Sequence, residues 1–478
     1  MSLAARPQFA LPRPSLAGAE TDRLIRIGAL FVAASLAVVT DFWILFPAVL
    51  LLYAIWRYIP TPGEAPVIKL ALSYQWAQVF CGLIFYPLAG MPFRPGPDRM
   101  PFIILSFGCL TALFLGILVG FWLSARRGPQ PPKIPYFFAD WQLYLGYFGF
   151  VFGSGLIVAI AWEMESITQI LLTLNYFKFA FLFLLLRRLI AQRNYSMATL
   201  IGALEILVGF TGYFGGFREA FAIILLVLFE RFQPRRWQHW SAAAALMAAM
   251  VGSGVVWTGI KGRLRQHLDT GGADESILHR FDRVYLAAID FATDTSEGKG
   301  AMETLEKLVD RMWTTNFPAM ALERVPTQVP HSEGQFVSNA VMHVLRPRLF
   351  FPDKVALVTD SEKVRTYSGV WVAGAESNTS IAFGYAIESY IDFGVPIMFY
   401  PVFGFGVLFG LMYKFLVNNL VHRELAIAST VVITWSGLYL FERSWDRMLA
   451  TTVLLFAVVG VTSLVAERLF QARNRRVY

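Results

Sequence analysis

The sequence predicts an all-α polytopic membrane protein with about 12 transmembrane helices and one large external loop that contains short helices. Two properties of the 478-residue chain support this prediction. Hydrophobic residues make up 56% of the chain and charged residues only 15%, and the mean hydropathy is +0.53. A soluble globular domain usually has about 25% charged residues. The composition therefore excludes an ordinary soluble fold.

Apolar runs that approach the thickness of a bilayer give the expected spans. The hydrocarbon core requires about 20 apolar residues per helix. The candidate runs are 25–40, 42–58, 67–90, 101–124, 141–162, 167–186, 196–214, 219–230, 240–260, 394–416, 425–441 and 448–466. The first two and the eighth are short, so we expect a kink at Thr40-Asp41 and a half-helix at 219–230.

The distribution of lysine and arginine predicts the orientation. Basic residues concentrate in alternate connections, including RRLIAQRN and RFQPRRW, and such connections lie in the cytoplasm. Both termini are then cytoplasmic, and the net charge of +8 reflects topology rather than nucleic-acid binding. The expected organisation is a cytoplasmic segment 1–24, transmembrane helices in 25–260, a large periplasmic loop or cap 261–393, three further transmembrane helices in 394–466, and a cytoplasmic basic tail 467–478.

The large loop is expected to be a folded cap on the membrane surface. The segment 275–292, ESILHRFDRVYLAAIDFA, spaces its apolar residues as one stripe of a helix. Residues 301–326 predict a second, shorter amphipathic helix that breaks near Pro318. Prolines recur after residue 326, so we expect the remainder of the loop to be irregular.

HVLRPRLFFPDK, residues 343–354, concentrates cations in that loop. Arginine binds phosphate with two parallel hydrogen bonds and stays charged at every relevant pH. Arg346 and Arg348 flank one proline, beside an apolar pair that can enter the membrane interface. The cluster therefore suits a lipid-linked phosphate or diphosphate. Ion pairing with the carboxylates of the loop is the alternative. His343 could act as a base, although a lone histidine is more often structural.

Other charged residues near the ends of the expected spans are also candidates. Arg218 follows a glycine pair at the start of a span, where an anion would be favoured, but a local pair with Glu219 is equally consistent. FERSWDRM, residues 441–448, contains Arg443 and is more simply a solvated hairpin tip.

Ionisable residues inside or beside the spans are functional candidates, because charge within a membrane is costly. Lys178 and Glu205 lie on neighbouring spans, and we expect them to pair with each other. Glu388 and Asp392 share one helical face at the outer mouth of the tenth span, where a general base could act. No acidic pair recommends a metal, and the two cysteines lie in apolar runs without metal-ligand spacing.

The order of these features resembles the Wzy-type O-antigen and exopolysaccharide repeat-unit polymerases. The resemblance covers about 343–412. It rests on Pro347, Arg348, Pro352, Asp353 and Lys354, followed by Glu388, Tyr390, Phe393 and Gly394. Val395-Pro396 stands where that family often has a second glycine, so the turn after Asp392 differs.

The resemblance implies a metal-independent, cofactor-free membrane glycosyltransferase with a GT-C-like fold in the bacterial inner membrane. Such an enzyme polymerises undecaprenyl-diphosphate-linked oligosaccharide at the periplasmic face. Its partners are this lipid-linked substrate, the lipid bilayer and a chain-length regulator protein, without nucleic acid. We expect the diphosphate to be bound by Arg218, Arg346, Arg348 and Lys354. Glu388 and His343 are rival bases, with Glu388 preferred, and Asp392, Arg443 and Tyr390 are secondary candidates.

Three other functions share some of these features. An O-antigen ligase would use the same donor with a different acceptor. A polysaccharide flippase or transporter would need charged residues along many spans, whereas here the polar residues concentrate in one external loop. A membrane O-acyltransferase lacks a buried catalytic histidine in this sequence.

Overall fold

The structure is a computed structural model that describes residues 16–60, 65–124, 134, 136–164, 167–210, 216–233, 235–269, 277–296, 300–347, 350–351, 354, 357–374, 376 and 379–475. Within these ranges the regular secondary structure is helical, and one isolated bridge joins Ile134 to His422. The prediction of an all-α protein is confirmed.

The part of the chain before the large loop forms ten helices in the described residues. They are α1 (Leu16–Thr40), α2 (Leu45–Tyr58), α3 (Val67–Leu88), α4 (Met100–Leu123), α5 (Asp140–Glu163), α6 (Thr168–Leu174), α7 (Phe177–Ala191), α8 (Tyr195–Phe210), α9 (Phe217–Glu230) and α10 (Trp237–Asp269). The expected kink is present, because α1 ends at Thr40 and Asp41 has a φ of 60°.

Seven helical segments of the described chain are long and apolar enough to cross a membrane. They are Val67–Leu88, Met100–Leu123, Asp140–Glu163, Thr168–Ala191, Trp237–Lys261, Phe399–Asn419 and Trp445–Leu469. The protein is therefore a polytopic helical membrane protein. The predicted count of about 12 also includes the apolar part of α1, Ile25–Thr40, together with α2, α8, α9 and α18, which have only 14 to 16 residues each.

The C-terminal part of the chain forms four helices, and one of them, α18, is the buried central helix of the molecule. They are α17 (Phe399–Asn419), α18 (Arg423–Leu438), α19 (Trp445–Leu455) and α20 (Val461–Arg475), with one π-helical turn, Phe456–Gly460, between the last two. Every residue from Glu424 to Leu438 is buried, so α18 has protein on all sides. Its two ends therefore define two interior regions of the molecule.

The large loop is more helical than the sequence predicts. It contains α11 (Ile277–Ser296), α12 (Ala301–Met312), α13 (Asn316–Arg324), α14 (Gln335–Leu345), α15 (Asp360–Ser368) and α16 (Tyr385–Phe393). The expected helix at 275–292 is confirmed as α11. The break in the next segment falls at 313–315, and Pro318 lies in the first turn of α13, where a missing N–H costs nothing.

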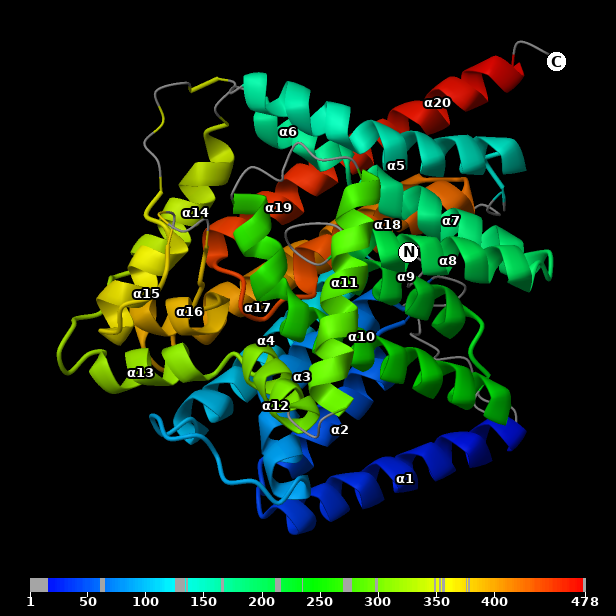
Figure 1. The fold of residues 1–478 in the computed structure, drawn as a ribbon. Helices are drawn as coiled ribbons and strands as arrows, with labels where there is room; N and C mark the ends of the chain where they lie inside the picture. Colours follow the sequence, from blue (N-terminus) through cyan, green and yellow to red (C-terminus); the bar gives the residue numbers. More distant parts are fainter. Residues whose placement is uncertain are drawn as a thin grey trace.

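The expectation of irregular chain after residue 326 is wrong. The prolines lie in the connections before and after α14 and do not prevent three short helices from forming. Helices α13 to α16 gather at one side of the molecule (Figure 1).

Helices α4 and α17 pack closely through glycines spaced four residues apart. The glycines are Gly116 and Gly120 on α4, and Gly406 and Gly410 on α17. A Cβ on Gly116 would lie 2.2 Å from the carbonyl oxygen of Phe403, so a side chain there would separate the helices. Small residues at this spacing are the usual basis of close helix contacts in membranes. This pair places α16, which precedes α17, against the bundle.

Candidate functional site

A large cavity lies between the end of α18 and the helices of the cap. Its volume is about 2240 Å³, well above the roughly 300–1,000 Å³ of a typical small-molecule pocket. Part of the wall is apolar and comes from α6, α10 and α19, including Ile170, Met250, Trp257 and Leu454. The rest carries charged side chains from α9, α12 and the α18–α19 connection. The cavity can therefore hold a ligand that has both apolar and charged parts.

Arg218 and Glu219 form one side of the cavity at the start of α9. Arg218 hydrogen-bonds Tyr74 of α3, and Glu219 Oε1 accepts a hydrogen bond of 3.2 Å from the Tyr439 hydroxyl. The other carboxylate oxygen of Glu219 is buried without a hydrogen-bond partner in the described part of the chain. The local pair between these two neighbours, expected as an alternative, is replaced by contacts to two other helices.

The connection between α18 and α19 lies inside the protein. Ser444 and Trp445 are 0% and 1% exposed, so the solvated hairpin tip expected for FERSWDRM is wrong. Arg443 donates to the carbonyl oxygen of Ser436, and its guanidinium lies 5.7 Å from the centre of the Tyr439 ring. The last turn of α18 thus holds Arg443 at the cavity.

Glu442 is a half-buried carboxylate among arginines. Burial raises the pKa of Glu442, and the charges of Arg218, Arg311 and Arg443 oppose that increase. All four residues line the cavity. This side of the cavity therefore offers three guanidinium groups to an anion, beside the carboxylates of Glu219, Asp310 and Glu442.

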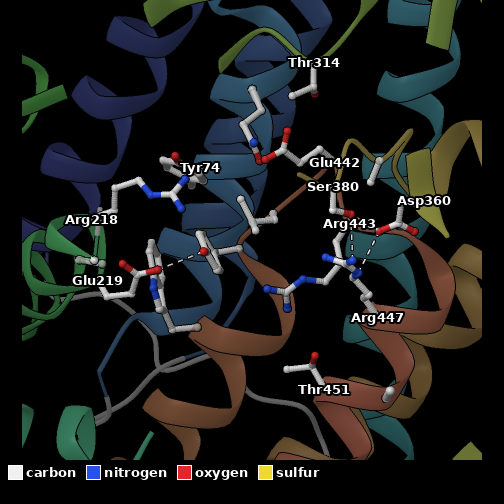
Figure 2. A pocket seen from close by; sticks show the side chains of 18 of the residues that line it. Tyr74, Arg218, Glu219, Thr314, Asp360, Ser380, Glu442, Arg443, Arg447 and Thr451 are labelled. Atoms are coloured by element: carbon white, nitrogen blue, oxygen red, sulfur yellow. Dashed lines mark hydrogen bonds and ion pairs between the residues drawn. The ribbon is translucent and has the colours of Figure 1, made fainter. Parts of the chain in front are cut away.

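The opposite side of the cavity is formed by Arg447, Asp360 and Ser380 (Figure 2). Arg447 Nε lies 2.9 Å from Asp360 Oδ2, and its Nη2 donates to Ser380 Oγ at 2.9 Å. Ser380 Oγ in turn donates to Asp360 Oδ2 at 3.3 Å. Figure 2 shows this group across the cavity from Arg218 and Glu219.

A buried lysine lies behind that wall and contacts three carboxylates. Lys363 Nζ lies 3.0 Å from Glu388 Oε1, 3.2 Å from Asp446 Oδ2 and 3.9 Å from Asp360 Oδ1. Oxygens of the three carboxylates lie within 4.8 Å of one another, a spacing that could suit a metal ion. The ammonium group of Lys363 already supplies positive charge to all three.

The protonation of this cluster follows from burial and mutual attraction. Burial raises the pKa of Glu388 to about 7, although Lys363 opposes the increase. Burial lowers the pKa of Lys363, but the three carboxylates outweigh this and hold it above its usual value. Lys363 therefore stays charged at neutral pH, while Glu388 carries a proton part of the time.

The structure brings four of the predicted site residues to the cavity: Arg218, His343, Lys354 and Arg443. Lys354 Nζ donates to the backbone oxygens of His343 and Arg346 at the end of α14, where a cation favours the helix dipole. Arg346 is exposed and does not line the cavity. Arg348 lies outside the described residues.

The other three predicted residues lie away from the cavity and hold the cap together. Glu388 is 1% exposed and binds Lys363 and the backbone N–H of Trp445. Asp392 accepts hydrogen bonds from Ser332 Oγ and from backbone N–H groups of the first turn of α14, at 2.6 to 3.0 Å. The Tyr390 hydroxyl donates to the Val325 carbonyl at 3.0 Å.

Several cavity residues were not identified from the sequence. Tyr74, Arg311, Asp360 and Ser380 carry no local signal, because each becomes notable only through neighbours distant in the chain. FERSWDRM does carry a local signal. Its four charged residues and its tryptophan come shortly after Arg423–Leu438, a run of 16 residues in which only the first two are charged. The predicted pair inside the spans is confirmed, with Lys178 Nζ 2.6 Å from Glu205 Oε1.

Fold and site together define a polytopic helical membrane protein with a large cavity of mixed charge. Residues 126–419, more than half of the chain, match the family described as a domain of unknown function (DUF8712), and the chain belongs to that family. Neither a curated protein nor a solved structure matches the chain.

Proposed function

We propose that the protein is a membrane glycosyltransferase that polymerises lipid-diphosphate-linked oligosaccharide units, such as O-antigen or exopolysaccharide repeats. One observation carries the proposal. Arg218, Arg311 and Arg443, from three separate parts of the chain, line one cavity that also has an apolar wall. The enzyme acts in the bacterial inner membrane with the cavity at the periplasmic face, as the distribution of basic residues predicts.

The arginines suit a diphosphate leaving group. Negative charge grows on the diphosphate as its bond to the sugar breaks, and fixed guanidinium groups stabilise that charge without reorganising. Arg218 and Arg443 are each held by contacts to other groups, to Tyr74 and to the Ser436 carbonyl respectively. Preorganised cations of this kind need no metal to perform this role.

The remaining wall of the cavity suits the other parts of the substrate. Apolar residues of α6, α10 and α19 can contact the lipid chain, and the volume of about 2240 Å³ has room for several sugars. Of the two bases that the sequence predicts, His343 lines the cavity and Glu388 does not. Lys354 acts at the diphosphate indirectly, because it fixes the end of α14 beside the cavity.

Chain length in cells tests this proposal. A strain that lacks the gene receives Arg218→Ala, Arg443→Ala or, as a matched control, Arg346→Ala, whose side chain is exposed outside the cavity. Loss of one charge-stabilising donor typically costs on the order of 100-fold in rate. We expect single repeat units from the first two variants and normal long chains from the control. Normal chains from both cavity variants would contradict the proposal.

The form of the accumulated glycan separates the rival functions. A lost polymerase leaves single lipid-linked units on the outer side of the membrane. A lost ligase leaves long glycans that remain on the lipid carrier, and a lost flippase leaves single units facing the cytoplasm. Protection of the glycan from an added glycosidase in intact spheroplasts distinguishes the last case.

A further inference from the structure

We propose that Asp446 is the base that accepts the proton of the acceptor sugar hydroxyl, and that buried Lys363 is its positioning residue. This inference rests on the proposed function and names the acceptor side of the same cavity. It replaces the role that the sequence favours for Glu388, which shares Lys363 with Asp446 but lies behind the wall.

The two sides of the cavity differ in charge. On one side, the guanidinium groups of Arg218, Arg311 and Arg443 lie around the carboxylate of Glu442 and line the cavity. On the other, the carboxylates of Asp360 and Asp446 line the cavity beside Arg447, and Lys363 contacts both of them from outside the lining. A leaving diphosphate belongs on the first side and a proton acceptor on the second. In a direct displacement the attacking hydroxyl and the leaving diphosphate lie on opposite faces of the anomeric carbon.

Asp446 is the member of the Lys363 cluster that both reaches the cavity and can be approached by a hydroxyl. Its side chain is 13% exposed and lines the cavity, whereas Glu388 is 1% exposed and does not. Asp446 Oδ1 accepts from the backbone N–H of Arg447 at 3.0 Å, and Oδ2 faces Lys363 at 3.2 Å. A carboxylate has about four lone-pair sites, so Asp446 can still accept a hydrogen bond from an incoming O–H group.

The groups around Asp446 fix its direction. Lys363 on α15, 7% exposed, contacts it at 3.2 Å, and Glu388 on α16 contacts the same ammonium group at 3.0 Å. Asp360 and Arg447, joined at 2.9 Å, form the adjoining wall, with Ser380 bound to both. Donors and acceptors therefore alternate along this wall, as the hydroxyl groups of a sugar require, because each hydroxyl both donates and accepts.

The reaction step balances without a co-reactant. The acceptor hydroxyl oxygen forms a bond to the anomeric carbon of the donor glycan, and its proton passes to the Asp446 carboxylate. The bond between that carbon and the diphosphate oxygen breaks, and its electron pair leaves with the diphosphate toward Arg218 and Arg443. Release of the proton to water then restores the Asp446 carboxylate.

Purified full-length protein in phospholipid vesicles provides the test. The substrate is the lipid-diphosphate-linked oligosaccharide of the source strain, and both chain extension and binding of undecaprenyl diphosphate are measured. Loss of a general base typically costs about 10²–10⁴-fold in rate. We expect Asp446→Asn to lose kcat to that extent while it binds undecaprenyl diphosphate normally. We expect Arg218→Ala to lose the binding as well.

Conservative variants separate chemistry from folding. Asp446→Glu keeps the charge but moves the carboxylate, so kcat should fall at least 10-fold without a change in gel-filtration behaviour. Lys363→Arg should retain more activity than Lys363→Met. Lys363→Met should also move the acid limb of the pH–rate profile to higher pH, because a carboxylate without its cation binds protons more readily. Asp140→Asn, at the other end of α18, is the matched aspartate control with wild-type kcat.

The outcomes distinguish the two proposals. If wild-type protein binds the lipid diphosphate but never extends a glycan, the proposed function fails. If wild type extends glycans and both Asp446→Asn and Asp446→Glu retain its kcat, the function stands and the assignment of Asp446 is overturned. Loss of activity in His343→Asn, with full activity in Asp446→Asn, transfers the role of base to His343.

Discussion

Two clusters of charged residues occupy opposite ends of the central helix α18, about 24 Å apart by helix geometry. At its start, three carboxylates pair with arginines: Asp140 and Glu424 with Arg188, and Glu230 with Arg187 and Arg423. A fourth, Glu467, contacts the ring Nδ1 of His422 at 2.6 Å. None of these residues lines the cavity. At its other end, the charged residues face the cavity, and one carboxylate oxygen, on Glu219, is buried without a partner.

The difference separates structural charge from charge that is available to a ligand. Arg188 binds two carboxylates and the carbonyl of Phe138, and its guanidinium lies 4.3 Å from the centre of the Tyr136 ring. It has no role left for a substrate. Arg218 and Arg443 instead hydrogen-bond neutral groups, a tyrosine and a backbone carbonyl, and within the described residues neither forms a close ion pair like those of Arg188. Complete pairing therefore marks the end of α18 that holds the bundle together.

The largest expected effect on stability comes from breaking the fully paired cluster. Arg188→Met leaves Glu424, which is 2% exposed in its side chain, without its cation. Removal of one partner of a buried pair costs about 3–5 kcal/mol. We expect a strongly lowered unfolding temperature in detergent but normal chain extension per folded molecule. A loss of activity without a loss of stability would show that this end of α18 is not merely structural.

A smaller and pH-dependent effect is expected at the cavity end. The pKa of Glu388 is raised to about 7, so the folded state binds the proton more tightly than the unfolded state. The resulting stability is fully present below about pH 4.3, the ordinary value of Glu, and is lost as pH rises through about 7. Its size is on the order of 3 kcal/mol.

The measurement is the unfolding temperature of wild type and Glu388→Gln between pH 4.5 and 8. Wild-type stability should fall across this range, and the fall should be smaller in Glu388→Gln, which cannot titrate there. Equal slopes for the two proteins would contradict a raised pKa at this carboxyl. The control is Glu303→Gln, since Glu303 is exposed and pairs only at the surface with Lys307.

The smallest effect on the free energy of unfolding is expected for the exposed pair of Lys307 and Glu303. It gives a reference value for the effects at the two ends of α18. Lys307 and Glu303 lie one helical turn apart on α12, with side chains 52% and 63% exposed. Exposed pairs of this spacing contribute about 0.3–0.5 kcal/mol. Lys307→Ala should therefore change the free energy of unfolding by no more than about 0.5 kcal/mol, measured by denaturant titration in detergent. A larger change would mean that α12 is held by more than its contacts with α3 and α10.

The sequence predicts helices better than it predicts which residues meet. Each of the expected apolar runs contains a helix, because hydropathy and helix length are local properties that a bilayer requires. The loop after residue 326 was expected to be irregular, yet Asp392 organises α14 from 56 residues away by accepting its first-turn N–H groups. A contact of that separation has no local signature. The same reason explains why Lys363 was not identified.

By itself the sequence determined that this is a polytopic helical membrane protein, that Lys178 and Glu205 pair, and that cations gather near residues 343–354. Its apolar runs and isolated charges permit few other arrangements in a bilayer. Only the tertiary structure decided which charges share a cavity, because Tyr74, Arg218, Arg311, Asp360 and Asp446 meet only when α18 is enclosed by the other helices. Burial then distinguished the two candidate bases, because Glu388 is enclosed behind the cavity wall and Asp446 forms part of that wall.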